Sequence, residues 1–260
     1  MTGPSATGPR KGKLPAEASL EELIHEQSAE VLIAVACDAR LTEDLALAML
    51  NRRDLPREAL EEMNRNEAVA KHRKVRLAIV MHPRTPRHVS VPTIRHLHAF
   101  ELMQVGLFPA VPADVKRAAE ETLIGRLGTI SSGERCMLAK QSSNRVAAAL
   151  LLDQEERVMQ AALLNAQMTE ALIVKALRAE QETELLVAAV CHHEKWSRRN
   201  DIKMALLANE NTPFARVLQF ANELPVKTLK EVLVSSRLSA NVKAYLRSVV
   251  ESRQSGKGRI

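Results

Sequence analysis

The hydrophobic positions of this chain recur with the spacing of an α-helix. In the stretch VRLAIVM, Val75, Ala78 and Ile79 fall on one helical face, and Leu77 and Met81 widen that face. We therefore predict a helix here that is buried on most of its sides.

Polar residues after this stretch predict where one helix ends and the next begins. The break HPRT ends in Thr85, which precedes Pro86. We expect the Thr85 hydroxyl to accept a hydrogen bond from an unpaired amide of the next helix, whose first position suits proline. The segment 202–217 repeats the pattern, with the break ANEN followed by Thr212 and Pro213.

Threonines at comparable positions divide the chain into similar lengths. They stand at positions 42, 85, 129, 169 and 212, separated by 43, 44, 40 and 43 residues, and Ser131 or Ser132 is the alternative helix start near position 129. A period near 43 residues containing a helix pair is typical of HEAT and armadillo proteins. Because one pair cannot bury its apolar face alone, we predict an all-α solenoid of about five to six stacked helix pairs.

The two best copies resemble the leucine-rich repeat variant family, whose units read approximately Val-Arg-x-Ala, a polar break, Thr-Pro and Leu. The matching residues are Val75, Arg76, Ala78, Thr85, Pro86 and Val89, and then Ile202, Lys203, Ala205, Thr212, Pro213 and Val217. The resemblance implies alternating helices, some short, in a right-handed superhelix. Some relatives carry an iron–sulfur cluster on an N-terminal cysteine group, which this sequence lacks, and we predict no cofactor.

The composition supports helices and indicates a reducing compartment. Aromatic residues make up 2% of the chain, whereas Ala and Leu, strong helix formers, are abundant. The three cysteines are far apart and odd in number, which is typical of a cytoplasmic protein. No apolar run reaches the roughly 18 residues that span a bilayer, so we predict no membrane association.

The predicted domain occupies residues 18–253. Residues 1–17 are rich in Gly, Pro and Ala and are expected to form a flexible basic tail, and residues 254–260 a short basic tail. The proline-rich segment 107–118 is a candidate for a local irregularity or for a seam between two half-arrays.

Basic side chains are the candidate partner-binding residues. The net charge is +6, which suits an acidic partner. Two clusters precede the two best repeats, and stacking would place them on one edge: Lys71, Arg73, Arg76, Arg84, Arg87 and Arg95, then Lys195, Trp196, Arg198, Arg199 and Lys203. The alternative interpretation is an ordinary solvated surface. Trp196 is either an exposed anchor for a partner or a residue that fills a gap between helices.

Patterns that predict catalysis or metal binding are absent from the sequence. His96 and His98 are two residues apart and His192 and His193 are adjacent, so neither pair shares a helical face. The acidic stretches EALEEMNRNE and DQEER are expected on solvated helix surfaces, and the sequence contains no nucleophile elbow or phosphate-binding glycine motif. We predict no catalytic, cofactor-binding or metal-binding residues.

Two functions remain open from the sequence. The first is a non-enzymatic scaffold that binds another protein with an acidic surface through a concave face and a basic edge. The second is nucleic-acid binding by a HEAT-like protein. Its less favoured variant is a DNA glycosylase, for which Trp196 and Asp201 lie nearest a basic cluster. The sequence does not determine the oligomeric state.

Overall fold

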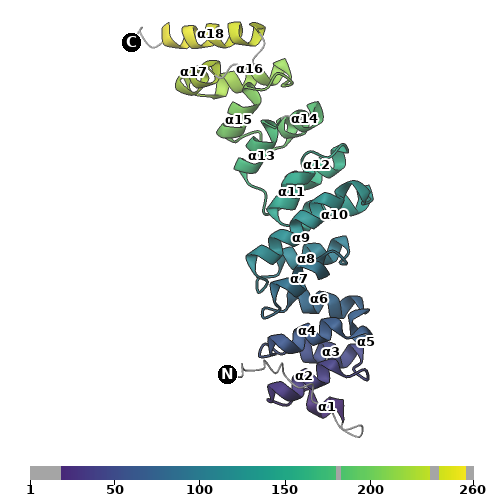
Figure 1. The fold of residues 1–260 in the computed structure, drawn as a ribbon. Coiled ribbons are helices and arrows are strands. Elements are labelled where there is room, and N and C mark those ends of the chain that lie inside the picture. The colour runs from purple at the N-terminus through teal and green to yellow at the C-terminus, as the bar shows by residue number, and fades with distance from the viewer. Residues whose placement is uncertain (1–18, 180–182, 235–239, 256–260) are drawn as a thin grey trace, which may run out of the picture. The chain divides into compact units, whose positions relative to one another are not determined.

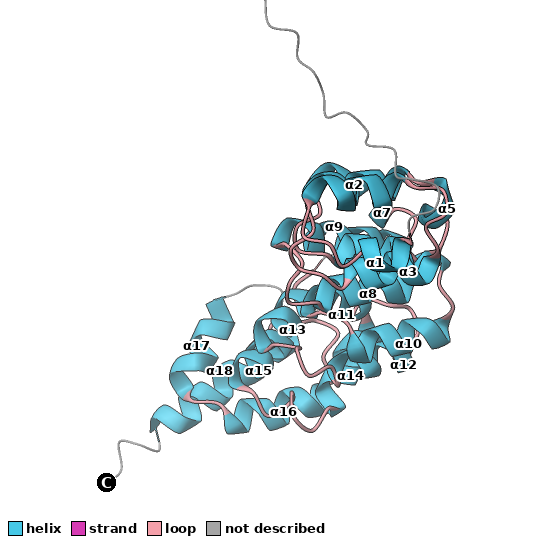
Figure 2. Cartoon of the chain, turned by 90° about the horizontal axis from the view of Figure 1, so that it is seen from below, coloured by secondary structure: helices cyan, strands magenta, loops and turns pink. Residues whose placement is uncertain are grey.

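The fold is all-α. The computed structural model describes residues 19–179, 183–234 and 240–255, and within these ranges it contains α-helices and one short 3-10 helix but no strand (Figure 2). This confirms the fold class expected from the Ala- and Leu-rich composition. The residues assigned to the N-terminal tail lie outside the described ranges, as do residues 256–260 of the C-terminal tail.

The chain divides into two compact units, residues 1–128 and 129–260. The division falls after the proline-rich segment 107–118 that the sequence analysis considered as a seam. The helices of unit 1 (Figure 1) are α1 (Leu20–Leu23), α2 (Ala29–Cys37), α3 (Glu43–Leu50), α4 (Arg57–Arg65), α5 (Glu67–Ala70), α6 (Arg73–Met81), α7 (Arg87–Ile94), α8 (Ala99–Leu107) and α9 (Ala113–Arg126).

Unit 2 continues with helices of similar length. The 3-10 helix η1 (Leu127–Thr129) contains the boundary. The helices that follow are α10 (Ser132–Gln141), α11 (Asn144–Leu150), α12 (Glu156–Leu163), α13 (Glu170–Leu177), α14 (Glu184–His192), α15 (Asn200–Leu207), α16 (Phe214–Glu223), α17 (Val226–Val234) and α18 (Ala240–Ser255).

The threonine spacing of the sequence does not mark a helix pair. The interval from position 85 to 129 contains α7, α8 and α9, and the interval from 169 to 212 contains α13, α14 and α15. The expectation of two helices per interval is therefore wrong. The physical reason is helix length, because most of these helices have only seven to ten residues, so three or four helices with their loops occupy each interval.

Each helix buries its apolar side against helices close to it in the sequence. In unit 1, α2 packs on α4, α3 on α6, α6 on α8 and α7 on α9. One contiguous group of buried apolar side chains runs from Leu20 to Val89 and includes Val75 and Ile79 of α6. Burial of this area is the main stabilising contribution, because single short helices are marginal in water.

Unit 2 repeats this pattern of packing. Helix α10 packs on α12, α12 on α14, α11 on α13, α13 on α15 and α16 on α18. In α18, Leu246, Val249 and Val250 are buried. Residues 254 and 255, assigned from the sequence to the tail, belong to α18.

Each Thr-Pro sequence directly precedes a helix, as predicted, with Pro86 at the N-cap of α7 and Pro213 at the N-cap of α16, but the threonine hydroxyl bonds to the preceding helix. The buried Thr85 hydroxyl donates to the carbonyl of Ile79 at 2.5 Å, and the buried Thr212 hydroxyl donates to the carbonyl of Leu206 at 2.6 Å. The predicted acceptor role of Thr85 is therefore wrong. Each hydroxyl satisfies a carbonyl in the last turn of the preceding helix, which has no partner within that helix.

Other helix starts follow the expected capping chemistry in part. Thr42 caps α3 by accepting from the Leu45 amide at 3.3 Å, as predicted. Thr169 precedes α13 but its side chain accepts no capping bond. Near position 129, Ser131 begins α10 and forms a reciprocal capping box with Glu134.

Side chains in the polar breaks connect the ends of helices two apart. Asn66, after α4, donates from Nδ2 to the carbonyls of Ala36 and Asp38 at the end of α2, at 2.9 Å each. Asn165, after α12, donates likewise to the carbonyl of Ala139 in α10 at 2.8 Å. In both asparagines Oδ1 accepts the amide two residues further on, an Asx turn that leads the chain into the next segment.

His82 and Asn209 make the equivalent contact at two further helix ends. His82 Nε2 lies 2.8 Å from the carbonyl of Arg52, beyond α3, while Nδ1 accepts the Arg84 amide at 3.2 Å. Since Nδ1 accepts, the proton is on Nε2 and the imidazole is neutral. Asn209 Nδ2 donates to the carbonyl of Leu177 at the end of α13, at 3.3 Å.

Candidate functional site

The first basic cluster is largely engaged within unit 1. Arg73 pairs with Glu101 at 3.0 Å and Arg87 pairs with Asp114 at 3.3 Å. Arg84 donates to the carbonyl of Asp54 at 2.8 Å. A guanidinium that already has an acceptor gains less from a new partner, so these side chains are weaker candidates for partner binding than the sequence suggests.

Two residues of the predicted cluster remain available. The side chains of Lys71 and Arg95 are exposed and, in the part of the chain that the structure describes, have no hydrogen-bond or ion-pair partner. Arg76 differs, because it is half-buried and its Nη2 donates to the carbonyl of Lys71 at 3.4 Å. Fewer basic side chains of this cluster are therefore available to a partner than the sequence suggests.

Trp196 in unit 2 is not an exposed anchor. Its side chain is 3% exposed, and Nε1 donates to the carbonyl of Leu163 at the end of α12, at 2.8 Å. Lys195 lies over the ring, with Nζ 4.0 Å from the ring centroid. The structure therefore confirms the alternative in which Trp196 fills a gap between helices, and the indole cannot stack on a partner's aromatic group.

Lys203 is also removed from the partner-binding candidates. It is 8% exposed, and Nζ pairs with Glu223 Oε2 at 2.5 Å. The hydrogen bond from Lys203 is the main reason that the pKa of Glu223 is lowered. In contrast, Arg198 and Arg199 are exposed, and neither has a side-chain partner within the described ranges.

A groove on unit 1 was missed by the sequence analysis. We call it the α6 groove, and it has a volume of about 420 Å³. Its lining includes Leu50, Arg53, Lys74, Leu77, Met81 and Phe108. Leu77 and Met81 are half-buried rather than fully buried, and Phe108 is 39% exposed. The prediction that α6 is buried on most sides is therefore wrong on this face, although the spacing of Lys74, Leu77 and Met81 could have identified it.

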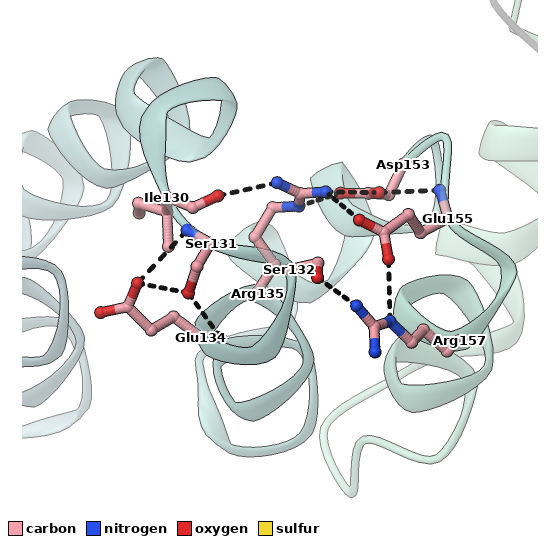
Figure 3. Close-up of polar contacts among 8 residues, drawn as sticks. All are labelled: Ile130, Ser131, Ser132, Glu134, Arg135, Asp153, Glu155 and Arg157. Carbon is pink, nitrogen blue, oxygen red and sulfur yellow. Dashed lines mark hydrogen bonds and ion pairs between the residues drawn. The ribbon is translucent and has the colours of Figure 1, made fainter.

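The acidic stretch DQEER belongs to an ion-pair network at the start of α10 (Figure 3). Arg135 pairs with Asp153 at 2.7 Å and with Glu155 at 3.1 Å, and Glu155 also pairs with Arg157 at 2.8 Å. Arg157 in turn contacts Ser132. These ion pairs link α10 to the loop before α12, so the network has a structural role rather than the simple solvated surface expected.

The histidines and cysteines give no grouped site in the described residues. No three His, Cys, Asp or Glu side chains lie close enough there to hold a metal ion. His72 and His88 lie beside single carboxylates, Glu43 at 3.1 Å and Glu61 at 3.2 Å. Burial raises the pKa of the Cys191 thiol to about 11, which disfavours the reactive thiolate.

Unit 2 has a cavity of about 470 Å³ between α13 and α15. Its lining includes Glu170, Val174, Arg178, Asp201 and Met204. Asp201, the carboxylate considered for glycosylase chemistry, faces this cavity but has no aromatic residue beside it there. A site for base chemistry would need such a surface for stacking.

Comparisons of the chain with protein-family models, with curated proteins and with solved structures find no match. In the described part of the molecule, no helix is both long enough and apolar enough to cross a bilayer.

Proposed function

We propose that this protein is a non-enzymatic scaffold that binds another protein with an acidic surface. The observation that carries the proposal is a group of exposed cations in or beside the two predicted basic clusters that have no partner in the described structure, namely Lys71, Lys74 and Arg95 in unit 1 and Arg198 and Arg199 in unit 2. Unpaired cations are the groups that gain most from an acidic partner.

The proposed architecture is a right-handed α-solenoid of the leucine-rich repeat variant kind. Its support is the recurrence of the contacts made by Asn66, His82, Asn165 and Asn209, each from the end of one helix to the end of an earlier helix on which it packs. Donor and acceptor are 30, 30, 26 and 32 residues apart, which corresponds to one helix pair. The proposed repeat is therefore shorter than 43 residues.

Nucleic-acid binding is the second candidate. It is favoured by the adjacent exposed side chains of Arg198 and Arg199, which suit a phosphate backbone. Because Trp196 is buried, it cannot stack on a base as a glycosylase would require. The second candidate function is therefore phosphate binding without base chemistry.

The two functions are separated by direct binding measurements. We expect cross-linking in the source cell to recover a protein partner whose cross-links include Lys71 or Lys74, and the charge reversal of Lys71, Arg95, Arg198 and Arg199 to abolish its capture. Reversal at Arg247, which is exposed and has no described partner, is the matched control. Steep, salt-dependent anisotropy changes with labelled duplex or single-stranded DNA, lost in the same variant, would instead support the alternative.

A further inference from the structure

The α6 groove combines an apolar floor with positive charge at its rim. Leu50, which is 7% exposed, lines it together with the half-buried Leu77 and Met81 and with Phe108, which is 39% exposed. The volume of about 420 Å³ is within the range of about 300–1,000 Å³ typical of ligand sites. An apolar side chain that entered it would contact Leu77, Met81 and Phe108 and be partly removed from water.

The rim cations are available for a partner. Arg53 and Lys74 are exposed, and neither has a hydrogen-bond or ion-pair partner among the described residues. The neighbouring Arg52 is different, because Nη1 donates to the carbonyls of Ile24 and Glu26, at 2.7 Å each, and Nη2 pairs with Asp54. None of the described residues that line the groove is acidic.

Lys74 also occupies a position where its positive charge destabilises its own helix. It lies in the first turn of α6, which contains no acidic residue, at the positive end of the helix dipole. Arg73 in the same turn is offset by Glu101, but Lys74 is not. A carboxylate bound beside Lys74 would interact favourably with both the ammonium group and the helix terminus.

From this arrangement we propose that the α6 groove binds a short segment of a partner protein that combines acidic with large apolar side chains. Its apolar groups would enter between Leu77, Met81 and Phe108, and its carboxylates would pair with Arg53 and Lys74. The inference rests on the proposed scaffold function and specifies the chemistry of its partner.

Charge complementarity argues against the chain's own ends as the occupant. Residues 1–18 contain Arg10, Lys11 and Lys13 against Glu17, and residues 256–260 contain Lys257 and Arg259 and no acidic residue. Both segments therefore carry the same sign of charge as the rim. The length of the groove along α6, from residue 74 to 81, is about 10 Å, so a segment of about two helical turns suffices to cover it.

The test is the binding of a defined peptide to the full chain. The probe is a fluorescein-labelled peptide of about twelve residues, slightly over three helical turns, with Leu or Phe on one face and Asp or Glu elsewhere. Fluorescence anisotropy should show saturable binding. A peptide with Asn and Gln in place of the acids, and one with Ser in place of the apolar residues, should each bind at least about tenfold more weakly.

Variants locate the site. The double variant Arg53→Glu/Lys74→Glu and the single variant Phe108→Ala should each weaken binding by about tenfold or more, whereas Arg247→Glu should not. Circular dichroism verifies that each variant is folded, and hydrogen exchange of the wild-type complex should show protection in α6 and residues 108–110. Peptide binding that is unchanged in both groove variants would overturn the inference.

Other occupants give distinct results. Self-association that is lost in Phe108→Ala would identify a second copy as the occupant and overturn the inference. Displacement of the peptide by a tighter-binding single-stranded DNA would do the same in favour of nucleic acid. If the cellular partner cross-links only to positions remote from the α6 groove and no acidic peptide binds, the inference fails while the scaffold function stands.

Discussion

At the scale of single residues, Thr85 and Thr212 show how one motif serves the structure twice. Both hydroxyls are buried and both donate to a carbonyl six residues earlier, at 2.5 and 2.6 Å. The sequence pattern identified the two positions as equivalent but assigned the wrong partner, because a threonine between two helices can bond to either one.

We expect Thr85→Val and Thr212→Val each to lower the free energy of unfolding by about 1 kcal/mol. The loss should be moderate because the carbonyls of Ile79 and Leu206 each keep one backbone amide, from His82 and Asn209. Urea denaturation measures the change. Thr169→Val is the control, because the side chain of Thr169 makes no capping bond. An equal loss of stability in this variant would contradict the role of the Thr85 and Thr212 hydroxyls as donors.

His82 should make stability depend on pH. Burial lowers the pKa of His82, and the positive charge of Arg84 lowers it further. The hydrogen bond to the backbone carbonyl of Arg52 raises the pKa but does not cancel the effect of burial. Because the unfolded chain then takes up a proton more readily than the folded chain, stability should fall as the pH drops below about 6.5 and should stop falling below the folded-state pKa. We expect a flatter dependence in His82→Gln between about pH 7.5 and pH 5.5.

The measurement is the free energy of unfolding at each pH in the presence of urea. His96→Gln, at an exposed position, controls for the loss of a histidine. A slope in His82→Gln equal to that of the wild type would show that His82 is not responsible.

At the scale of elements, short helices are held in register by side chains of the polar breaks. Asn165 is 2% exposed and makes three hydrogen bonds, two to carbonyls at the end of α10 and one to the Gln167 amide. Such a residue orders its own loop and also joins two helices. These bonds add to the apolar burial that stabilises helices of about eight residues, each of which would be marginal alone.

We expect Asn165→Ala to reduce the free energy of unfolding by about 2–3 kcal/mol, because buried carbonyls lose their donor. Chemical denaturation measures it. Asn144→Ala, at an exposed position of α11 with no side-chain hydrogen bond in the described structure, should change stability by no more than about 0.5 kcal/mol. Similar losses in the two variants would contradict the contribution of the interhelical bonds.

At the scale of the whole molecule, the packing is local in sequence. Within each unit the principal helix contacts join helices no more than three apart in the chain, and the proposed solenoid extends this rule along the chain. In such an array, stability is nearly a sum of repeat and interface contributions, so a defect remains close to its origin.

Hydrogen exchange tests this property in the full chain. We expect Asn165→Ala to accelerate exchange in α10 to α14 while α2 to α6 exchange at the wild-type rate, because a linear array transmits instability only through adjacent helices. Uniform acceleration over all helices would indicate a single cooperative core and would contradict the proposed repeat architecture.

Local features of this protein could be predicted from its sequence. The Ala- and Leu-rich periodicity predicted that the chain is helical, and the breaks HPRT and ANEN predicted where two helices end. Thr42 and Ser131 cap the helices that follow them, as expected. These properties depend on residues within about four positions of each other, which a helical pattern displays directly.

Only the tertiary structure decided which side chains are available to a partner. Arg73 is engaged by Glu101, 28 residues away, and Trp196 by the carbonyl of Leu163, 33 residues away, while Lys203 is buried against Glu223. Arg53 and Lys74 line an apolar groove and have no partner among the residues that the structure describes. Charge and burial at these positions depend on which helices stack together, and periodicity along one helix carries no record of that pairing.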